Sequence, residues 1–408
     1  MCLSRPAFTQ SNSKLLDSIL KANPVLQKVI LAKKKYRLQI IYTQINRDKD
    51  NKPVFKDHAY LLDSTKYFYP ASTVKLPCSV FALEKINQLN IKGLQRDTPM
   101  LTDSAGICQR RNWVDTSTQN LYPNIEQHIK KMLLVSDNNS FSRVFEFLDP
   151  RYITSRMTSL GHPTTRIIHR LDAACSGAGN RYFNPVRFIS ETTGQLVYFQ
   201  PGDSLKEEFT PPLGDVVIGR DIFNRRKKLI SQKKNFTKSN YLPLQTLHNF
   251  MRNLVFNEFR PRDKQFNINR SDWEFLMKHL GMLPRESTSP AYDSTVYYDA
   301  FKKYFIYGGA VKHIESDTLR IFNIVGRAYG FEIDCAYIVD YRTGLEFMLS
   351  AVIYTNSRNS FGSGKYEYDA VGLPFLRELS LALYRFESKR TKKHLPDLRN
   401  IDFYRNAK

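Results

Sequence analysis

The sequence predicts an α/β (α+β) fold in which a five-stranded antiparallel sheet is flanked by helices and joined to an all-helical lobe. Three observations predict it: a β-hairpin pattern near the N-terminus, three β-rich runs near the C-terminus, and a long middle segment that is mostly helical. Strands at both ends of a chain are most simply paired in one sheet. The terminal helices would then cover one face of that sheet and the middle helices the other.

The N-terminal region predicts helices followed by a hairpin. Residues 13–34 have the apolar spacing of two short helices, and Pro24 breaks the run. Residues 36–46 then alternate apolar and polar side chains, as a half-buried strand does. The turn-forming segment 48–51 leads into residues 54–62, which we expect to form the returning strand.

The C-terminal region returns to strand patterns. Residues 319–326, 331–340 and 345–354 are three β-rich runs separated by short glycine-containing turns. Residues 368–386 repeat apolar side chains at helical spacing and predict a last helix. With the hairpin, these runs supply the strands of one sheet.

The middle of the chain is predicted to be mostly helical. An apolar stripe over residues 244–255 and a capping box, Ser271 with Glu274, each predict an ordinary core helix. Residues 190–240 are punctuated by Pro and Gly and then strongly basic, which is typical of an elaborated surface insertion. The predicted organisation is an N-terminal segment and helix (1–35), an α/β sheet lobe (36–71 and 319–388), a helical lobe (72–318) with the basic insertion at about 190–240, and a basic tail (389–408).

The charge balance favours anionic partners. The 408 residues include 61 Lys and Arg against 39 Asp and Glu, a formal net charge of +22. Such a field attracts nucleic acids, anionic envelope polymers or carboxylate substrates. The basic residues are spread out, however, and their densest clusters, at 225–228 and 389–393, lie in loop-like stretches without a nucleic-acid-binding motif. We therefore expect no nucleic acid as a partner, and an anionic envelope polymer remains open.

The composition excludes several classes of protein. Hydrophobic residues make up 42% of the chain, which is enough for a sizeable core, so predominant disorder is excluded. No run approaches 18 apolar residues, so no transmembrane helix is predicted. The five cysteines contain no C-x-x-C pair and the eight histidines no ligand-like spacing, so we expect no metal and no cofactor. Residues 1–11 lack the apolar core of a secretory signal, although residues 6–10 could be the end of one.

Two motifs could carry chemistry, and the first is the S-x-x-K sequence from Ser72 to Lys75. The same spacing starts at Ser11, Ser18 and Ser231, but only Ser72 follows a proline-containing turn and opens an apolar helix. A hydroxyl there lies beside free backbone N–H groups and the positive end of the helix dipole. Lys75, one turn on, could take the serine proton as a neutral amine. The structural alternative is an N-cap serine with a solvated lysine.

The second motif is Ser136-Asp137-Asn138, at the point where one apolar segment meets another. A hydroxyl and an amide placed there could relay a proton and hold a substrate carbonyl. The structural alternative is a helix cap, because Ser, Asp and Asn are all favoured at that position.

The two motifs, in this order and about sixty residues apart, followed by late strands around a glycine, resemble the penicillin-recognising serine enzymes. Within them the chain is most similar to the class A β-lactamases and their relatives. The resemblance covers most of the chain, from the opening hairpin to the last helix, apart from residues 190–240. It implies a β-lactamase/transpeptidase-like fold, a serine hydrolase that works through an acyl-enzyme, and a periplasmic or otherwise extracytoplasmic location.

The resemblance also implies roles for the motif residues. Ser72 would be the acylated nucleophile, and Lys75 its general base or relay. Ser136 would pass a proton toward the leaving nitrogen, and Asn138 would hold the side-chain amide of the substrate.

The third motif of the family matches Ile324-Val325-Gly326, followed by Arg327. Gly326 fits, because a glycine lets the substrate backbone approach the strand. The backbone N–H of Arg327 would form the oxyanion hole together with that of Ser72. Ile324 does not fit, since the family has a lysine there for the substrate carboxylate. Arg327 is expected to supply that charge instead, with the less favoured alternatives Arg320 and Arg342.

The family's deacylating carboxylate has its counterpart in a loop that begins with His169-Arg170-Leu171-Asp172. Asp172 would activate the water, and Asn184 would help to hold it. Aspartate is one methylene shorter than glutamate, so the water would be displaced, and about 1 Å can cost on the order of 100-fold in rate. A structural interpretation is equally favoured, in which Arg170 and Asp172 form an ion pair that holds the loop in place.

These observations predict a serine hydrolase that acts on a β-lactam or a related amide or ester through Ser72. A D-alanyl peptidase or an esterase on the same fold is the first alternative, because of Ile324 and Asp172. A catalytically impaired protein that binds an anionic envelope polymer is the second.

Overall fold

A computed structural model describes residues 11–104, 110–171, 177–224, 226–309, 311–316 and 318–405. The chain divides into two compact units, which we describe separately. The sheet unit comprises the chain up to Thr73, Pro211–Arg260, and the chain from Ala300 onward. The helical unit comprises Val74–Thr210 and Pro261–Asp299.

The sheet unit is built on the predicted five-stranded antiparallel sheet, in the order β12-β13-β14-β1-β2. Its strands are β1 (Gln39–Arg47), β2 (Pro53–Tyr60), β12 (Leu319–Ala328), β13 (Phe331–Asp340) and β14 (Leu345–Tyr354). Every residue of β13 and β14 is buried, because helices cover both faces of the sheet. β12 is an edge strand, so one row of its backbone groups is not paired with another strand of this sheet.

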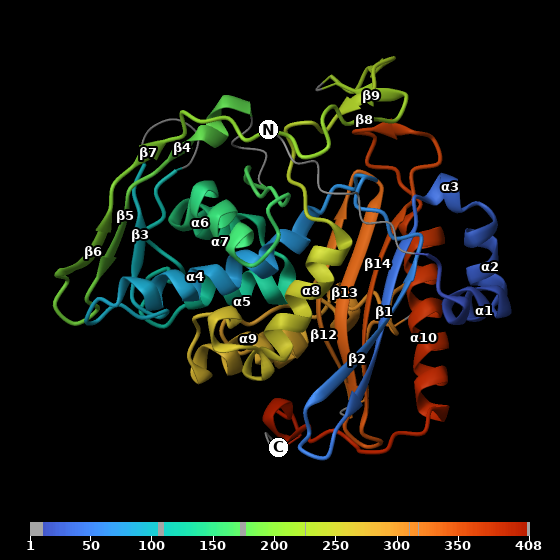
Figure 1. Cartoon of the computed structure of the whole chain (residues 1–408). Helices are drawn as coiled ribbons and strands as arrows, with labels where there is room; N and C mark the ends of the chain where they lie inside the picture. The colour runs from blue at the N-terminus through green and yellow to red at the C-terminus, as the bar shows by residue number, and fades with distance from the viewer. Residues whose placement is uncertain are drawn as a thin grey trace. The chain divides into compact units, whose positions relative to one another are not determined.

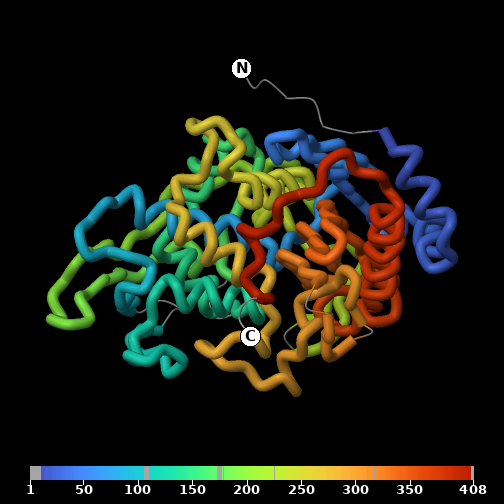
Figure 2. The backbone as a smooth tube through the Cα atoms, turned by 90° about the horizontal axis from the view of Figure 1, so that it is seen from below, coloured from blue at the N-terminus to red at the C-terminus, as the bar shows by residue number. Residues whose placement is uncertain are grey.

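Helices from the two ends of the chain cover one face of the sheet, and a middle helix covers the other (Figure 1). The first layer consists of α1 (Lys14–Ala22), α2 (Pro24–Leu31) and α10 (Leu373–Lys389), and α3 (Lys33–Tyr36) follows α2. Figure 2 shows α1 and α2 beside α10. On the other face, α8 (Leu244–Val255) contacts β1, β13 and β14. The predicted layering is confirmed.

The basic insertion forms small strands in the sheet unit. β8 (Val217–Ile218) pairs with β11 (Lys234–Asn235), and β9 (Asp221–Phe223) lies between β10 (Leu229–Ile230) and β15 (Ser360–Phe361). Phe236 anchors this segment, because its buried ring lies 5.4 Å from that of Tyr67 and 6.1 Å from that of Tyr69. The second half of the insertion is therefore packed into the unit that contains Ser72.

The helical unit surrounds the buried helix α4 (Lys75–Leu89), which contacts the other helices of the unit. These are α5 (Ile125–Val135), α6 (Asn138–Leu148), α7 (Pro150–Ser159) and α9 (Arg270–Gly281). A small sheet, β3 (Met100–Thr102), β5 (Val186–Ile189) and β6 (Leu196–Gln200), and a pair, β4 (Tyr182–Phe183) with β7 (Asp203–Ser204), complete it. No helix in the described ranges is long and apolar enough to cross a membrane.

The predicted capping box of α9 is wrong. Asn269 is the N-cap, and its side chain accepts a hydrogen bond from the backbone N–H of Asp272. The helix starts before Ser271, and Glu274 pairs with Arg270 one turn earlier. Asparagine is as good an N-cap as serine, so the earlier start satisfies the free N–H groups equally well.

Short helical turns join these elements. They are the 3₁₀ turns η1 (Ala71–Val74), η2 (Gly177–Arg181), η3 (Asn257–Phe259), η4 (Arg262–Lys264), η5 (Pro284–Glu286), η6 (Asp299–Lys302) and η8 (Arg399–Ile401), and the π-helical turn η7 (Tyr368–Gly372).

Candidate active site

Ser72 lies in the tight turn η1, which leads directly into the first residue of α4. The turn is closed by Thr73, whose backbone N–H and hydroxyl both donate to the carbonyl of Pro70, at 3.1 and 2.7 Å. Ala71 has a positive φ of 48°, an uncommon conformation for a residue with a Cβ. The turn therefore holds a half-buried serine at the start of a helix, as the sequence predicts.

Lys75 is the first residue of α4 and is completely buried. Its Nζ donates to the carbonyl oxygen of Ser136 at 2.6 Å and to the hydroxyl of Ser136 at 3.0 Å. It also donates to Oδ1 of Asn138 at 2.7 Å. The structure thus brings the S-x-x-K lysine and the S-D-N motif together, and the alternative of a solvated lysine is wrong.

The S-D-N motif forms the turn between α5 and α6. Ser136 ends α5 in the left-handed conformation, with φ of 62°. Asp137 is the N-cap of α6, and its side chain accepts from the N–H of Ser140 at 2.6 Å. Asn138 is the first residue of α6. The cap interpretation is thus correct for Asp137, while Ser136 and Asn138 turn toward Lys75.

A buried histidine supports this turn from α5. His128 Nδ1 lies 3.3 Å from the hydroxyl of Ser140, in the first turn of α6. Burial, together with the smaller effect of the nearby Lys131 ammonium, lowers the pKa of His128 to about 4. His128 is therefore neutral at neutral pH.

Gly326 lies against the Ser72 turn. A Cβ at this position would come within 2.6 Å of the Pro70 carbonyl oxygen, 3.1 Å of Thr73 Cγ2 and 3.2 Å of Ala71 Cβ. A side chain would therefore collide with the backbone of the turn. The glycine was expected for the approach of a substrate; the structure shows that the chain's own turn already requires it.

The side chain of Arg327 does not supply the expected positive charge beside Gly326. Side chains alternate along a strand, so Ile324 shares a face with Gly326 and Arg327 points to the opposite face. There the guanidinium bonds the buried Glu332 and lies 4.9 Å from the ring centre of Tyr304. Ile324 itself is fully buried. The prediction that Arg327 supplies this charge was wrong. Consecutive side chains on a strand point to opposite faces, so the residue after Gly326 faces away from it.

Arg320 and Arg342 do not supply this charge either. Arg320 stacks on the ring of Tyr404 at 4.0 Å and lies six residues before Gly326, roughly 20 Å along an extended strand. Arg342 is an exposed turn residue after β13, near the same distant end of the strand.

A cation that sequence reasoning missed comes from the insertion. Lys234 Nζ lies 5.3 Å from the ring centre of Tyr329, and that ring lies 5.0 Å from the ring of Tyr69. Tyr69 is three residues before Ser72, and Tyr329 is three residues after Gly326. Within the sheet unit, Lys234 is thus connected to the segment before Ser72 through the rings of Tyr329 and Tyr69, and no local pattern in its basic run could have indicated this.

The predicted deacylation loop is held by a carboxylate that sequence reasoning also missed. Arg170 pairs with the fully buried Glu146 of α6 at 2.7 Å and also donates to the carbonyl of Tyr182 at 2.7 Å. Asn184 donates to Glu146 at 3.1 Å. Burial raises the pKa of Glu146, although Arg170 and Arg143 oppose the shift. Arg170 therefore pins the loop as an ion pair, with Glu146 as its partner, and Asn184 serves the same cluster. The signal that could have identified Glu146 from the sequence is the position of an acidic residue on the apolar stripe of α6.

Asp172, the predicted deacylating residue, lies outside the described residues, as do Cys2, Cys108 and Cys175. The other two cysteines, Cys78 and Cys335, are buried free thiols. Within the described part of the chain, no group of three His, Cys, Asp or Glu side chains has a metal-binding arrangement.

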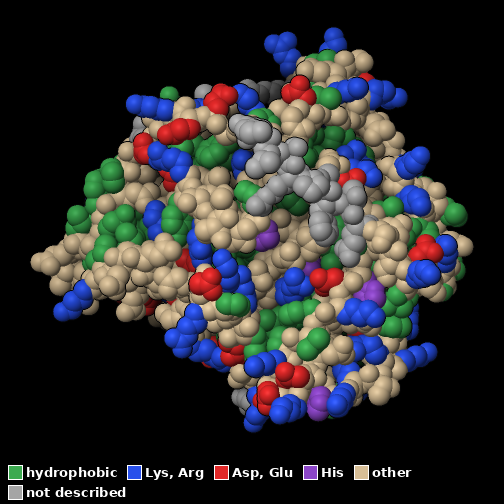
Figure 3. Space-filling view, viewed as in Figure 1, with side chains coloured by type: hydrophobic (Ala, Val, Ile, Leu, Met, Phe, Trp, Pro, Cys, Tyr) green, Lys and Arg blue, Asp and Glu red, His purple; other side chains and the backbone are tan. Residues whose placement is uncertain are grey.

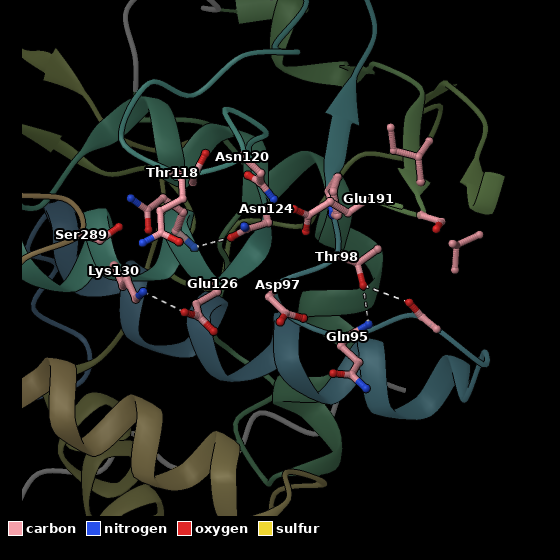
Figure 4. A pocket seen from close by; sticks show the side chains of 17 residues that line it. Gln95, Asp97, Thr98, Thr118, Asn120, Asn124, Glu126, Lys130, Glu191 and Ser289 are labelled. Carbon is pink, nitrogen blue, oxygen red and sulfur yellow. Dashed lines mark hydrogen bonds and ion pairs between the residues drawn. The ribbon is translucent and has the colours of Figure 1, made fainter. Parts of the chain in front are cut away.

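A polar hollow of about 600 Å³ elsewhere in the helical unit contains none of the predicted site residues (Figure 4). Several of its polar groups already serve the fold. Lys130 pairs with Glu126 at 2.8 Å, and Asn124 caps α5 by accepting from the N–H of Gln127. The candidate site is therefore the pair of motifs around Lys75.

Residues 23–195 match the model of the β-lactamase enzyme family. This segment contains both the S-x-x-K and the S-D-N motif, and it ends before β12. Together with the antiparallel sheet and its helices, the match shows a β-lactamase-related serine hydrolase fold, as the resemblance implied. No curated protein matches the chain in sequence.

Solved structures of β-lactamases are similar to the chain at low identity. The class A β-lactamase of Clostridium kluyveri is 12% identical with a TM-score of 0.46, over 88% of this chain and 97% of that one. The chromosome-encoded β-lactamase of Vibrio parahaemolyticus is 11% identical with a TM-score of 0.47, over 90% and 100%. The class A β-lactamase of Mycobacterium abscessus is 12% identical with a TM-score of 0.47, over 89% and 98%.

Proposed function

We propose that this protein is a serine hydrolase that cleaves a β-lactam, or a related amide or ester, through an acyl-enzyme on Ser72. The observation that carries the proposal is the position of Lys75, whose Nζ lies within 3.0 Å of oxygens from both Ser136 and Asn138. A buried lysine with neutral oxygen partners is the arrangement that a proton relay needs.

In the acylation step, the Ser72 hydroxyl attacks the substrate carbonyl and its proton passes to the neutral amine of Lys75. The new bond joins Oγ to the carbonyl carbon, and the bond from that carbon to the leaving nitrogen or oxygen breaks. The Ser136 hydroxyl, 3.0 Å from Nζ, returns the proton to the leaving group.

The negative charge that develops on the carbonyl oxygen needs hydrogen-bond donors. We assign this role to the backbone N–H groups of Ser72 and Arg327, the second on the edge strand β12. A water molecule would then hydrolyse the acyl-enzyme, with Asp172 as the candidate base.

A D-alanyl peptidase or an esterase on the same fold is the second candidate. It is favoured by the sheet unit, where Ile324 is apolar and buried and Arg327 is paired with Glu332. A penicillin carboxylate would then lack the cation that the family supplies from this strand, whereas a neutral ester needs none. We also propose an extracytoplasmic location, which the family resemblance implies.

The test is an intact-mass time course of the wild-type protein with benzylpenicillin and with a neutral phenyl ester. Ser72→Ala removes the nucleophile, and Ser18→Ala, in another S-x-x-K sequence, is the matched control. A penicillin adduct that appears and disappears while the drug is consumed supports the β-lactamase. A persistent penicillin adduct, or turnover of the ester alone, supports the second candidate. Adducts that survive in Ser72→Ala, or none with either reagent, would overturn the proposal.

A further inference from the structure

A basic hollow in the sheet unit contains none of the residues assigned to catalysis. It has a volume of about 690 Å³ and is framed by the small sheet of β9, β10 and β15. On the face seen in Figure 3, Lys and Arg side chains gather over β8 and β9. The side chains that line the hollow come from two segments: Arg220, Phe223, Lys227 and Leu229 from one, and Ser357, Arg358, Ser360, Ser363 and Lys365, with Gly362, from the other.

The two segments are fastened to each other and to the main sheet. Phe361 is buried, and its ring lies 5.6 Å from that of Phe236 and 6.5 Å from that of Tyr354 on β14. Gly362 has φ of 82°, and a Cβ there would lie 3.0 Å from the carbonyl oxygen of Phe223. A Cβ at Gly219 would lie 2.4 Å from Cε2 of Phe361, so this position also has room only for glycine. The hollow therefore has a built frame rather than two independent loops.

The charge in the hollow is positive and largely unbalanced. In the described part of the chain, Lys227, Arg358 and Lys365 make no ion pair. Arg220 is the exception, since it pairs with Asp221 at 2.7 Å. The other nearby acid, Glu367, is bonded by the backbone N–H and hydroxyl of Ser357 and does not line the hollow. Its lining thus contains four cations and three hydroxyls but no carboxylate.

The hollow also has an apolar side. Phe223 and Leu229 line it, and Leu229 is 49% exposed. An apolar side beside unpaired cations fits an anion that carries an apolar group.

We propose that this basic hollow binds a phosphate group carried on an apolar body. A phosphate presents several oxygens to several donors at once, and arginine can bond it through two N–H groups. Arg358, Lys365 and Lys227 would neutralise the phosphate, and Phe223 and Leu229 would contact the apolar part. An anionic phospholipid headgroup and a soluble phosphate ester share this chemistry. None of the residues assigned to catalysis lines the hollow, and this proposal does not depend on the proposed hydrolase activity.

The experiment has one arm for each source of the phosphate. In the first, the full chain is sedimented with vesicles of phosphatidylcholine, with and without phosphatidylglycerol, whose negative charge attracts basic side chains. In the second, phenyl phosphate and inorganic phosphate are titrated by calorimetry. The double variant Arg358→Glu with Lys365→Glu reverses two unpaired cations. The control, Lys49→Glu with Lys52→Glu, makes the same charge change on exposed lysines at the β1–β2 turn.

Retention by phosphatidylglycerol vesicles that falls about 30-fold in the hollow variant, but stays near wild type in the control, supports the proposal with a lipid as the source. Binding of phenyl phosphate more tightly than inorganic phosphate, with the same variant dependence, supports it with a soluble ester as the source. Absence of binding in both arms would overturn it. Equal loss in the hollow variant and the control would also overturn it, because the net charge of +22 would then explain the attraction.

Discussion

The helical unit and strand β12 of the sheet unit carry different motifs, and they differ in how much of the family pattern they keep. In the helical unit, Lys75 donates hydrogen bonds to both Ser136 and Asn138, so the residues to which we assign proton transfer lie together. On β12, Gly326 is kept but Ile324 stands where the family has a lysine. This chain therefore keeps the residues to which we assign attack on a carbonyl without the lysine to which the family resemblance assigns recognition of a carboxylate.

The largest effect should come from removing the relay in the helical unit. Lys75→Met keeps an unbranched side chain of nearly the same length but has no amine to accept the Ser72 proton. Hydrolysis of a neutral ester should fall about 1,000-fold, as measured by kcat/KM. Lys21→Met, in the S-x-x-K sequence at Ser18, is the control, since Lys21 is a surface lysine paired with Asp17. A loss of less than tenfold in Lys75→Met would contradict the relay role that we assign to Lys75.

The second effect concerns the stability of the helical unit. Glu146→Ala leaves the buried guanidinium of Arg170 without its partner, and we expect a loss of about 3–5 kcal/mol in the free energy of unfolding. Asp203→Ala, which removes one partner of the exposed Arg151, should cost about 1 kcal/mol or less. Urea unfolding measures both. Similar losses in the two variants would show that Glu146 does not hold the loop.

The third effect is a pH dependence that originates beneath the S-D-N turn. Burial lowers the pKa of His128 from its ordinary value near 6.5 to about 4. Between these two values the unfolded chain binds a proton that the folded chain does not, so stability is lost as the pH falls. The loss by pH 4 amounts to about 3 kcal/mol for this group.

The variant His128→Gln should show a shallower decline of the unfolding free energy between pH 7 and 4.5 than the wild type. His313→Gln, at an exposed position, should keep the slope of the wild type. Parallel curves for His128→Gln and the wild type would contradict the assigned cause.

The smallest effect concerns position 324 on strand β12 and the recognition of a substrate carboxylate. Ile324→Lys returns a cation to the face of β12 that Gly326 shares. Acylation by benzylpenicillin should then rise about tenfold relative to the neutral ester, the effect of one charge-assisted hydrogen bond. Ile324→Met, with no charge, should leave the ratio unchanged. A ratio that does not move in Ile324→Lys, with the variant folded by circular dichroism, would show that recognition lies elsewhere, with Lys234 as the next residue to change.

The sequence predicted most of the fold because its signals are local and periodic. Residues 331–340 and 345–354 are strands with the predicted bounds, and Pro24 separates two helices as expected. The capping box of α9 was wrong because two acceptable N-caps lie two residues apart, and sequence alone does not choose between them.

The candidate site could be predicted only in part. Both motifs were found because their residues are contiguous. Glu146 was missed because its partner, Arg170, is 24 residues away, and the one local signal, an acid on the apolar stripe of α6, does not identify that partner. The orientation of Arg327 was predictable in principle, since a residue next to Gly326 on a strand must face the other side. Lys234 could not be predicted, because its place depends on how the basic insertion folds back onto Tyr329.

The most direct test of the central claim is to locate the modified residue after reaction with a phosphonylating probe, which needs no cation for a carboxylate. Peptide mass spectrometry should place the adduct on Ser72 in the wild-type protein and find none in Lys75→Met at the same time of reaction. Modification of Ser72 at an equal rate in Lys75→Met, or an adduct on another residue, would contradict the claim that Lys75 activates Ser72.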